Sequence, residues 1–159
     1  MTPVNIFVQK NGVIVSRNRK FGPASIIDSS VYYYNWKTDA VMLAESVQLF
    51  LDSTVAPVVD QEEFIHLQLM TKSLQCINAP AKAVKLGKLD PCVIVSHSSD
   101  GNFYNIVIFP KIASAIYAKY VKSGQPSPRK KFDYHFTTLE SFGLNLFSWS
   151  KQAIEWICA

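Results

Sequence analysis

Hydrophobic and polar positions at the start of the chain predict a β-hairpin followed by a further strand. Apolar segments at 4–9 and 13–16 flank a Lys-Asn-Gly turn at 10–12. Asn-Gly between alternating apolar residues is a strong hairpin signal. Residues 30–36, SVYYYNW, predict the further strand because aromatic and β-branched residues favour extended structure.

The second half of the chain predicts another hairpin and an alternating strand. Segments 92–96 and 103–109 flank the turn-rich stretch 98–102. Both carry apolar residues on both faces, which is typical of central strands. The segment 132–139 alternates cleanly. Its two faces carry Phe132, Tyr134 and Phe136 on one side, and Asp133, His135 and Thr137 on the other.

Three segments have apolar residues at helical spacing and predict helices at 39–52, 110–122 and 144–158. The first has one broad apolar face, formed by Ala40, Leu43, Ala44, Val47, Phe50 and Leu51. The last has an apolar stripe, formed by Leu146, Trp149, Ala153, Trp156 and Ile157.

Residues 62–70, EEFIHLQLM, are compatible with two structures. As a helix, the segment has Asp60 as N-cap, Glu63 as the capping-box partner, and Val59 and Phe64 as a hydrophobic staple. As a strand, it places Ile65, Leu67 and Leu69 on one face, and His66 and Gln68 on the other. Local rules favour the helix slightly, whereas a longer-range pattern favours the strand.

That longer-range pattern is a repeated order of elements: an aromatic strand, a helix, and a strand that carries a histidine. Tyr34 precedes His66 by 32 residues, and Tyr104 precedes His135 by 31 residues. A duplication of this kind would put the two histidines at equivalent positions of two pseudo-symmetric halves. We therefore expect residues 64–70 to form a strand.

Composition narrows the class of protein. With 159 residues, of which 48% are hydrophobic and 18% charged, the chain fits one compact domain rather than a disordered segment. No apolar run reaches the roughly 18 residues that span a bilayer, so no membrane partner is expected. Three cysteines without a C-x-x-C pair favour a reducing, cytoplasmic location. No metal-ligand spacing is present, so no metal and no other cofactor is expected. The net charge of +4 suggests phosphate or nucleic-acid partners.

The two histidines suggest chemistry on a phosphodiester. Residues i and i+2 of a strand share a face, so His135 would lie beside Thr137. His66 would lie beside Gln68 in the same way. A neutral imidazole can take a proton from the attacking hydroxyl or water, while a protonated one donates to the leaving oxygen. The Thr137 hydroxyl and the Gln68 amide would hold the phosphoryl oxygens. We expect His66 and His135 to be the catalytic pair, without a metal.

This arrangement resembles the 2H phosphoesterases, whose members carry two H-x-[ST] motifs on central strands of two pseudo-symmetric lobes. The stretch 134–139, YHFTTL, fits the apolar-flanked motif, and the stretch 65–69, IHLQL, has Gln68 in place of Ser or Thr. The resemblance implies a phosphoric diester hydrolase acting on an RNA-like substrate, either 2′,5′-oligoadenylate or a 2′,3′-cyclic phosphate. Family members that cleave oligoadenylates include viral antagonists of host RNA decay.

The resemblance also implies an α+β fold, with two pseudo-symmetric lobes of antiparallel sheet and outer helices around a central groove. The halves would be residues 30–80 and 92–140 of a single domain, 1–159. The N-terminal hairpin 3–16 and the C-terminal helix 144–158 would be additions to that plan.

A nucleic-acid-binding module without catalysis is the alternative function. In the phosphodiesterase as in this module, we expect strand aromatics such as Tyr34 and Tyr104 to bind the substrate by stacking on its bases, and the basic stretch 129–131, with Lys130 at its centre, to attract phosphate. RNA or another oligonucleotide is the expected partner under both hypotheses, and no protein partner is assigned.

Two further features have interpretations of their own. Helix 144–158 can dock on another chain through Trp149 and Trp156, which would make the chain a partner-binding domain. His97 also belongs to an H-x-S tripeptide, but it stands at the mouth of the predicted hairpin, and we interpret it as a turn residue.

Overall fold

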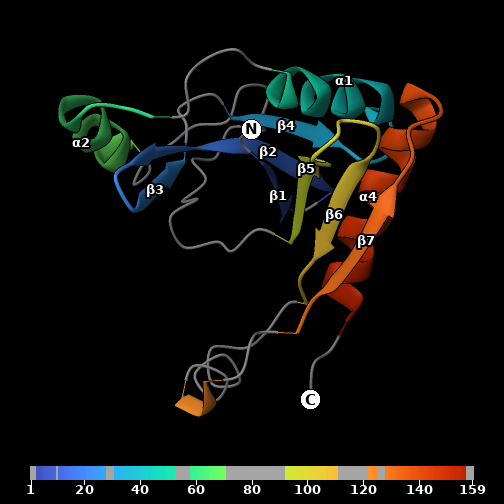
Figure 1. Cartoon of the computed structure of the whole chain (residues 1–159). Coiled ribbons are helices and arrows are strands. Elements are labelled where there is room, and N and C mark those ends of the chain that lie inside the picture. Colours follow the sequence, from blue (N-terminus) through green and yellow to red (C-terminus); the bar gives the residue numbers. More distant parts are fainter. Residues whose placement is uncertain are drawn as a thin grey trace.

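The computed structural model describes residues 3–9, 11–27, 31–52, 58–70, 92–110, 122–124 and 128–156. These residues form an α+β fold with one antiparallel sheet, which confirms the predicted class (Figure 1). The strands are β1 (Val4–Gln9), β2 (Gly12–Phe21), β3 (Ala24–Ile27), β4 (Tyr32–Asn35), β5 (Val93–His97), β6 (Tyr104–Ile108) and β7 (Lys130–Tyr134). The helices are α1 (Ala40–Leu51), α2 (Gln61–Met70) and α4 (Leu139–Glu155).

Six of the seven strands form two three-strand meanders placed side by side, and the seventh, β3, pairs with the last part of β2. The strand order of the sheet is β3-β2-β1-β5-β6-β7, and β4 pairs with the first part of the long strand β2. The first meander is β4-β2-β1 and the second is β5-β6-β7, and β1 pairs with β5 to join them. A helix follows each meander: α1 follows β4, and α4 follows β7. The described strands therefore belong to one continuous sheet.

Both predicted hairpins are confirmed, as β1–β2 and β5–β6. In the first turn Asn11 adopts a φ of 64°, a conformation that asparagine tolerates better than most residues. The expectation that this hairpin is an addition to the fold is wrong. Strand β1 pairs with both β2 and β5, and Val4 and Ile6 are completely buried. The hairpin occupies the middle of the sheet because its strands are apolar on both faces, and Phe7 and Ile14 are buried on the second face.

Helices α1 and α4 cover one face of the sheet and pack against each other. The apolar stripe predicted for the last helix is confirmed where it is described: Leu146, Trp149 and Ala153 are buried in the core. Where the two helices meet, Gly143 lies so close to Ala40 that a Cβ at position 143 would be 1.8 Å from the Ala40 carbonyl oxygen. Helix α4 is thus part of the core rather than an addition. Because Trp149 is buried within its own chain, there is no longer a reason to expect that this helix docks on another chain.

Residues 61–70 form the helix α2, so the expected strand at 64–70 is wrong. The Oδ1 atom of Asp60 accepts a hydrogen bond from the backbone N–H of Glu63 at 2.8 Å, which is the cap predicted for the helical alternative. The ring of Phe64 stacks on Phe21 of β2, with 5.1 Å between centroids, and Leu67 is buried. Because the helix is capped and one side of it is anchored, its backbone N–H and C=O groups form hydrogen bonds without a neighbouring strand. Among the described residues of the first half, the strand–helix–strand repeat therefore lacks the strand that was expected to carry His66.

The ends of the last elements also differ from the prediction. Strand β7 ends at Tyr134 rather than at residue 139, because Thr138 begins α4. The Oγ1 atom of Thr138 accepts a hydrogen bond from the backbone N–H of Ser141 at 3.1 Å. The predicted helix 110–122 falls almost wholly outside the described residues. Within the part of the chain that is described, no helix has the length and apolar character needed to cross a membrane.

Candidate functional site

The structure does not bring His66 and His135 together. His66 is exposed on α2, and that helix contacts β2 and β3 at one end of the sheet. His135 is exposed just after β7, which is the strand at the other end (Figure 1). Five spacings separate β3 from β7 in the strand order, and at about 4.8 Å each this amounts to roughly 24 Å. An acid and a base acting on one phosphate must both reach it within hydrogen-bond distance, so these positions do not form such a pair.

Tyr34 and Tyr104, which were predicted to bind substrate, belong to the core. Their side chains are 7% and 9% exposed, on the side of the sheet that faces α1 and α4. The ring of Tyr104 stacks on Phe142 at 5.0 Å, and its hydroxyl accepts a hydrogen bond from Nε2 of Gln48 at 3.2 Å. Burial raises the pKa of both phenols. These rings are committed to packing and are not available to stack on a base.

The other predicted binding residues lie in three separate places. Gln68 is exposed on α2, which contacts β2 and β3. Lys130 and Thr137 lie in and after β7, at the other end of the sheet. Thr137 is exposed in the segment between β7 and α4. Lys130 points to the helix side of β7, where its ammonium lies 4.9 Å from the centroid of the Trp156 ring. No single groove therefore unites the predicted set.

A different group of side chains shares one surface of the second meander. Alternation turns one set of residues in β5, β6 and β7 toward α1 and α4, and the other set away from them. We call the second surface the helix-free face, because none of the described helices covers it (Figure 1). It consists of Ile94, Ser96, Asn105, Val107, Lys131 and Asp133, with Phe103 and His135 just beyond the strand ends.

The register of the three strands places these side chains in rows across the helix-free face. One row consists of Ile94, Val107 and Lys131, and the next consists of Ser96, Asn105 and Asp133. The residues of β5 and β6 are half-buried, whereas those of β7 are exposed. Each row thus runs from a sheltered position to one that is open to solvent.

An aromatic pair lies next to the polar row. The rings of Phe103 and His135 are 5.4 Å apart between centroids and are tilted by 47°. Phe103 is half-buried and His135 is exposed. Two exposed cations, Lys131 and Arg129, come four and six residues before His135, in the same alternation as Asp133. The helix-free face therefore combines an accessible aromatic surface with positive charge.

Sequence reasoning missed most of this surface, although the signal was present. The alternation of 132–139 correctly separates Phe132 and Tyr134 from Asp133, and extending it backwards places Lys131 on the helix-free face and Lys130 on the helix side, although both lysines are exposed. The sequence predicts a central strand at 103–109 and assigns no ligand-binding role to Phe103 or Asn105.

His97 is not a turn residue, contrary to its interpretation from the sequence. It is the last residue of β5, and its Nε2 lies 3.2 Å from Oδ1 of Asp52, at the C-terminal end of α1. Its ring lies 5.3 Å from the ring of Tyr104, and its Nδ1 is buried without a hydrogen-bond partner. No hydroxyl or thiol of the described residues is hydrogen-bonded to this imidazole, so the contact serves to tie α1 to the sheet.

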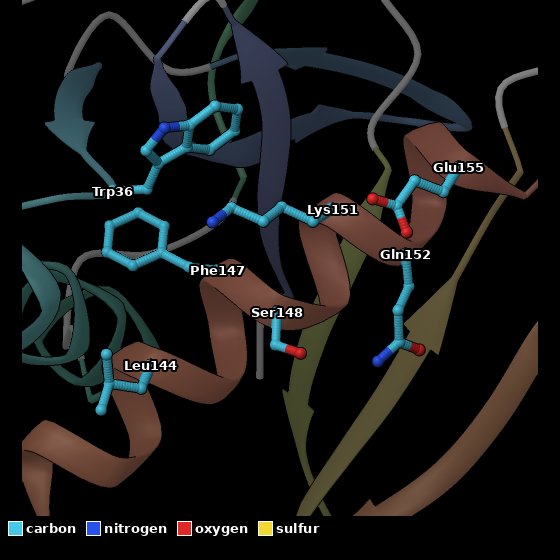
Figure 2. A pocket seen from close by; sticks show the side chains of 7 residues that line it. All are labelled: Trp36, Leu144, Phe147, Ser148, Lys151, Gln152 and Glu155. Carbon is cyan, nitrogen blue, oxygen red and sulfur yellow. The ribbon is translucent and has the colours of Figure 1, made fainter.

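A shallow pocket lies on the opposite side of the molecule, between α4 and the end of β4 (Figure 2). Its volume is about 340 Å³. Figure 2 shows Lys151 reaching from α4 toward Trp36, and its ammonium is 5.0 Å from the centroid of the indole. Trp36 and Phe147 form an apolar wall, whereas Gln152 and Glu155 form a polar rim. No motif in the sequence predicts this pocket.

Comparisons with known proteins add no identity to this geometry. No protein-family model, curated protein or solved structure matches the chain. Among the described residues, no group of three or more His, Cys, Asp or Glu side chains is arranged to hold a metal ion.

Proposed function

We propose that the chain binds single-stranded nucleic acid on the helix-free face. The observation that carries the proposal is the Phe103–His135 pair, which lies on the same sheet surface as Lys131, with the exposed Arg129 just before β7. Proteins that bind single strands combine aromatic rings, on which bases stack, with cations that follow the phosphates. Both components are present here on one face of the paired strands β6 and β7.

The spacing along β7 suits a nucleotide chain. Alternate residues of a strand are about 6.6 Å apart, so Lys131, Asp133 and His135 form a regular series on the helix-free face. A base stacked on Phe103 or His135 would have its phosphate on the side of the cations. Stacking on one aromatic ring contributes about 1–3 kcal/mol per base, and the cations add a salt-dependent attraction.

The two-histidine phosphodiesterase and its two-lobed groove are not part of this proposal. His66 lies on α2 and His135 beside β7, while His97, on β5, turns to the opposite face of the sheet, against Asp52 and Tyr104. The nucleic-acid partner expected from the sequence is retained, but the residues assigned to it change. Phe103 and Lys131 replace the buried Tyr34 and Tyr104 as the groups in contact with the ligand.

The test is fluorescence anisotropy of short labelled RNA and DNA, single-stranded and duplex, against the whole chain at several salt concentrations. Phe103→Ala and Lys131→Ala are both expected to weaken binding to single strands. Because Lys131→Ala removes one phosphate contact, this variant should also reduce the slope of log K against log salt by about 0.7. Equal or stronger binding to duplex, or no binding to any oligonucleotide, contradicts the proposal.

Lys130→Ala is the matched control, because it removes the same charge from the opposite side of the same strand. It is expected to bind as the unchanged protein does. If Lys130→Ala weakens binding as much as Lys131→Ala, the helix-free face is not the binding surface. The same oligonucleotides and a 2′,3′-cyclic nucleotide are also assayed for hydrolysis. Turnover that disappears in both His66→Ala and His135→Ala would favour the phosphodiesterase instead.

A further inference from the structure

The polar row of the helix-free face suggests which base is bound. Asn105 and Asp133 are directly opposite each other on β6 and β7. Side chains in such cross-strand positions have Cβ atoms about 5 Å apart, so both can reach one flat ligand edge. Neither side chain has a hydrogen-bond partner among the described residues, and Asp133 is exposed. The two groups are therefore available for a ligand.

The sign of Asp133 is the informative feature. A carboxylate repels phosphate, so its presence between Lys131 and His135 opposes general nucleic-acid binding. It becomes favourable only where a ligand offers it N–H donors, since an ionised carboxylate accepts hydrogen bonds and donates none. Asp133 thus selects for a base with donors on the edge that faces it.

The geometry points to guanine as the base that the helix-free face recognises, an inference that rests on the proposed function. The Watson–Crick edge of guanine presents one acceptor, O6, followed by two donors, N1–H and the 2-amino group. The Asn105 amide supplies a donor for O6, and the two oxygens of Asp133 accept from the two N–H groups. Adenine offers one donor beside one acceptor, and uracil offers a single donor between two acceptors. Cytosine offers one donor beside two acceptors, the reverse of what this pair needs.

The neighbouring aromatic ring offers a base a stacking partner beside the polar row. Phe103 precedes Asn105 by two residues on the same face, about 6.8 Å along the chain. A base stacked on Phe103 would lie next to the row of Asn105 and Asp133, within reach of both side chains. Ser96 is the next residue of that row and extends its polar character on the β5 side.

The experiment compares uridine-rich single strands that carry one central guanine, adenine, cytosine or inosine, measured by fluorescence anisotropy. Guanine is expected to bind roughly tenfold more tightly than adenine, as one good bidentate contact provides. Inosine lacks the 2-amino group and is expected to fall between the two. Asp133→Asn should remove the preference for guanine while retaining binding, whereas Glu45→Gln removes the same charge from α1 and should retain the preference.

The outcomes separate this inference from the proposed function. If all four strands bind with the same affinity and Phe103→Ala weakens them equally, guanine recognition is refuted and the binding function stands. If no strand binds, both fail. A preference for guanine that survives in Asp133→Asn refutes the role given to this carboxylate.

Discussion

Gly143→Ala should destabilise the protein, although glycine in a helix is ordinarily the weaker residue. In an exposed helix the substitution stabilises by about 1 kcal/mol, because alanine loses less backbone entropy on folding. At position 143 the new Cβ would stand 1.8 Å from the carbonyl oxygen and 2.4 Å from the carbonyl carbon of Ala40. Both are backbone atoms of the α1 terminus, so no side-chain rotation can relieve the contact.

The magnitude follows from how far the helices must move. A carbon and a carbonyl oxygen come no closer than about 3.3 Å in favourable contacts, so α1 and α4 must separate locally by roughly 1.5 Å. A gap of that size removes much of the dispersion energy between facing side chains. The buried surfaces of the two helices face each other here and include Leu43, Val47 and Leu146. Overpacking costs about 1–3 kcal/mol. An overpacking cost of about 3 kcal/mol, reduced by the gain of about 1 kcal/mol in helix propensity, gives a net loss of stability of about 2 kcal/mol.

Urea unfolding followed by circular dichroism measures this loss. With a slope of about 2 kcal/mol per M, the midpoint should fall by about 1 M. Ser148→Ala is the control: it lies on the exposed side of the same helix, and its midpoint should change little. A midpoint for Gly143→Ala equal to or above that of the unchanged protein, with the same slope, would refute the close approach of α1 and α4.

Two further predictions concern α2 and the cysteine beside β5. Asp60→Ala should remove the cap of α2 and reduce the local stability of this helix by about 1 kcal/mol. Amide hydrogen exchange in α2 should then be faster than in the unchanged protein, and unchanged exchange would contradict the cap. Burial raises the pKa of the Cys92 thiol to about 12, so in a Cys76→Ser, Cys158→Ser background it should react with a thiol reagent at pH 8 about a thousandfold more slowly than in the unfolded chain. Because the folded pKa is the higher one, the associated stability is complete below about pH 9 and is lost as the pH rises toward 12, which urea midpoints across that range will show; a flat profile would contradict it.

Much of the fold could be predicted because its signals are local. Asn11-Gly12 sets the first hairpin, and the apolar stripe of α4 is evident from spacing alone. The segment 61–70 shows where the sequence prediction failed. The N-cap at Asp60 is evident from the sequence, and its hydrogen bond is present in the structure. The long-range repeat, which favours a strand, does not outweigh this local signal.

The candidate site was less predictable, since it depends on which strands are neighbours. The face on which Asp133 lies follows from alternation, but its partner Asn105 follows only from the register of β6 and β7. The expected histidine pair failed for the same reason, because nothing in the spacing of His66 and His135 reveals that they belong to opposite ends of the sheet. Tyr104 was misjudged because a strand aromatic can face either side, and here α4 provides Phe142 as its stacking partner.

The junction between the two meanders has a consequence for how the chain folds. Only three residue pairs join β1 to β5, from Val4 with Val95 to Ile6 with Val93, and the partners are about ninety residues apart. Each meander contains hairpins that close over short stretches of chain, whereas this junction must overcome the entropy of a long loop for few backbone hydrogen bonds. The junction therefore contributes strongly to the contact order of the sheet, and its closure rather than the formation of either hairpin is the step that topology makes slow.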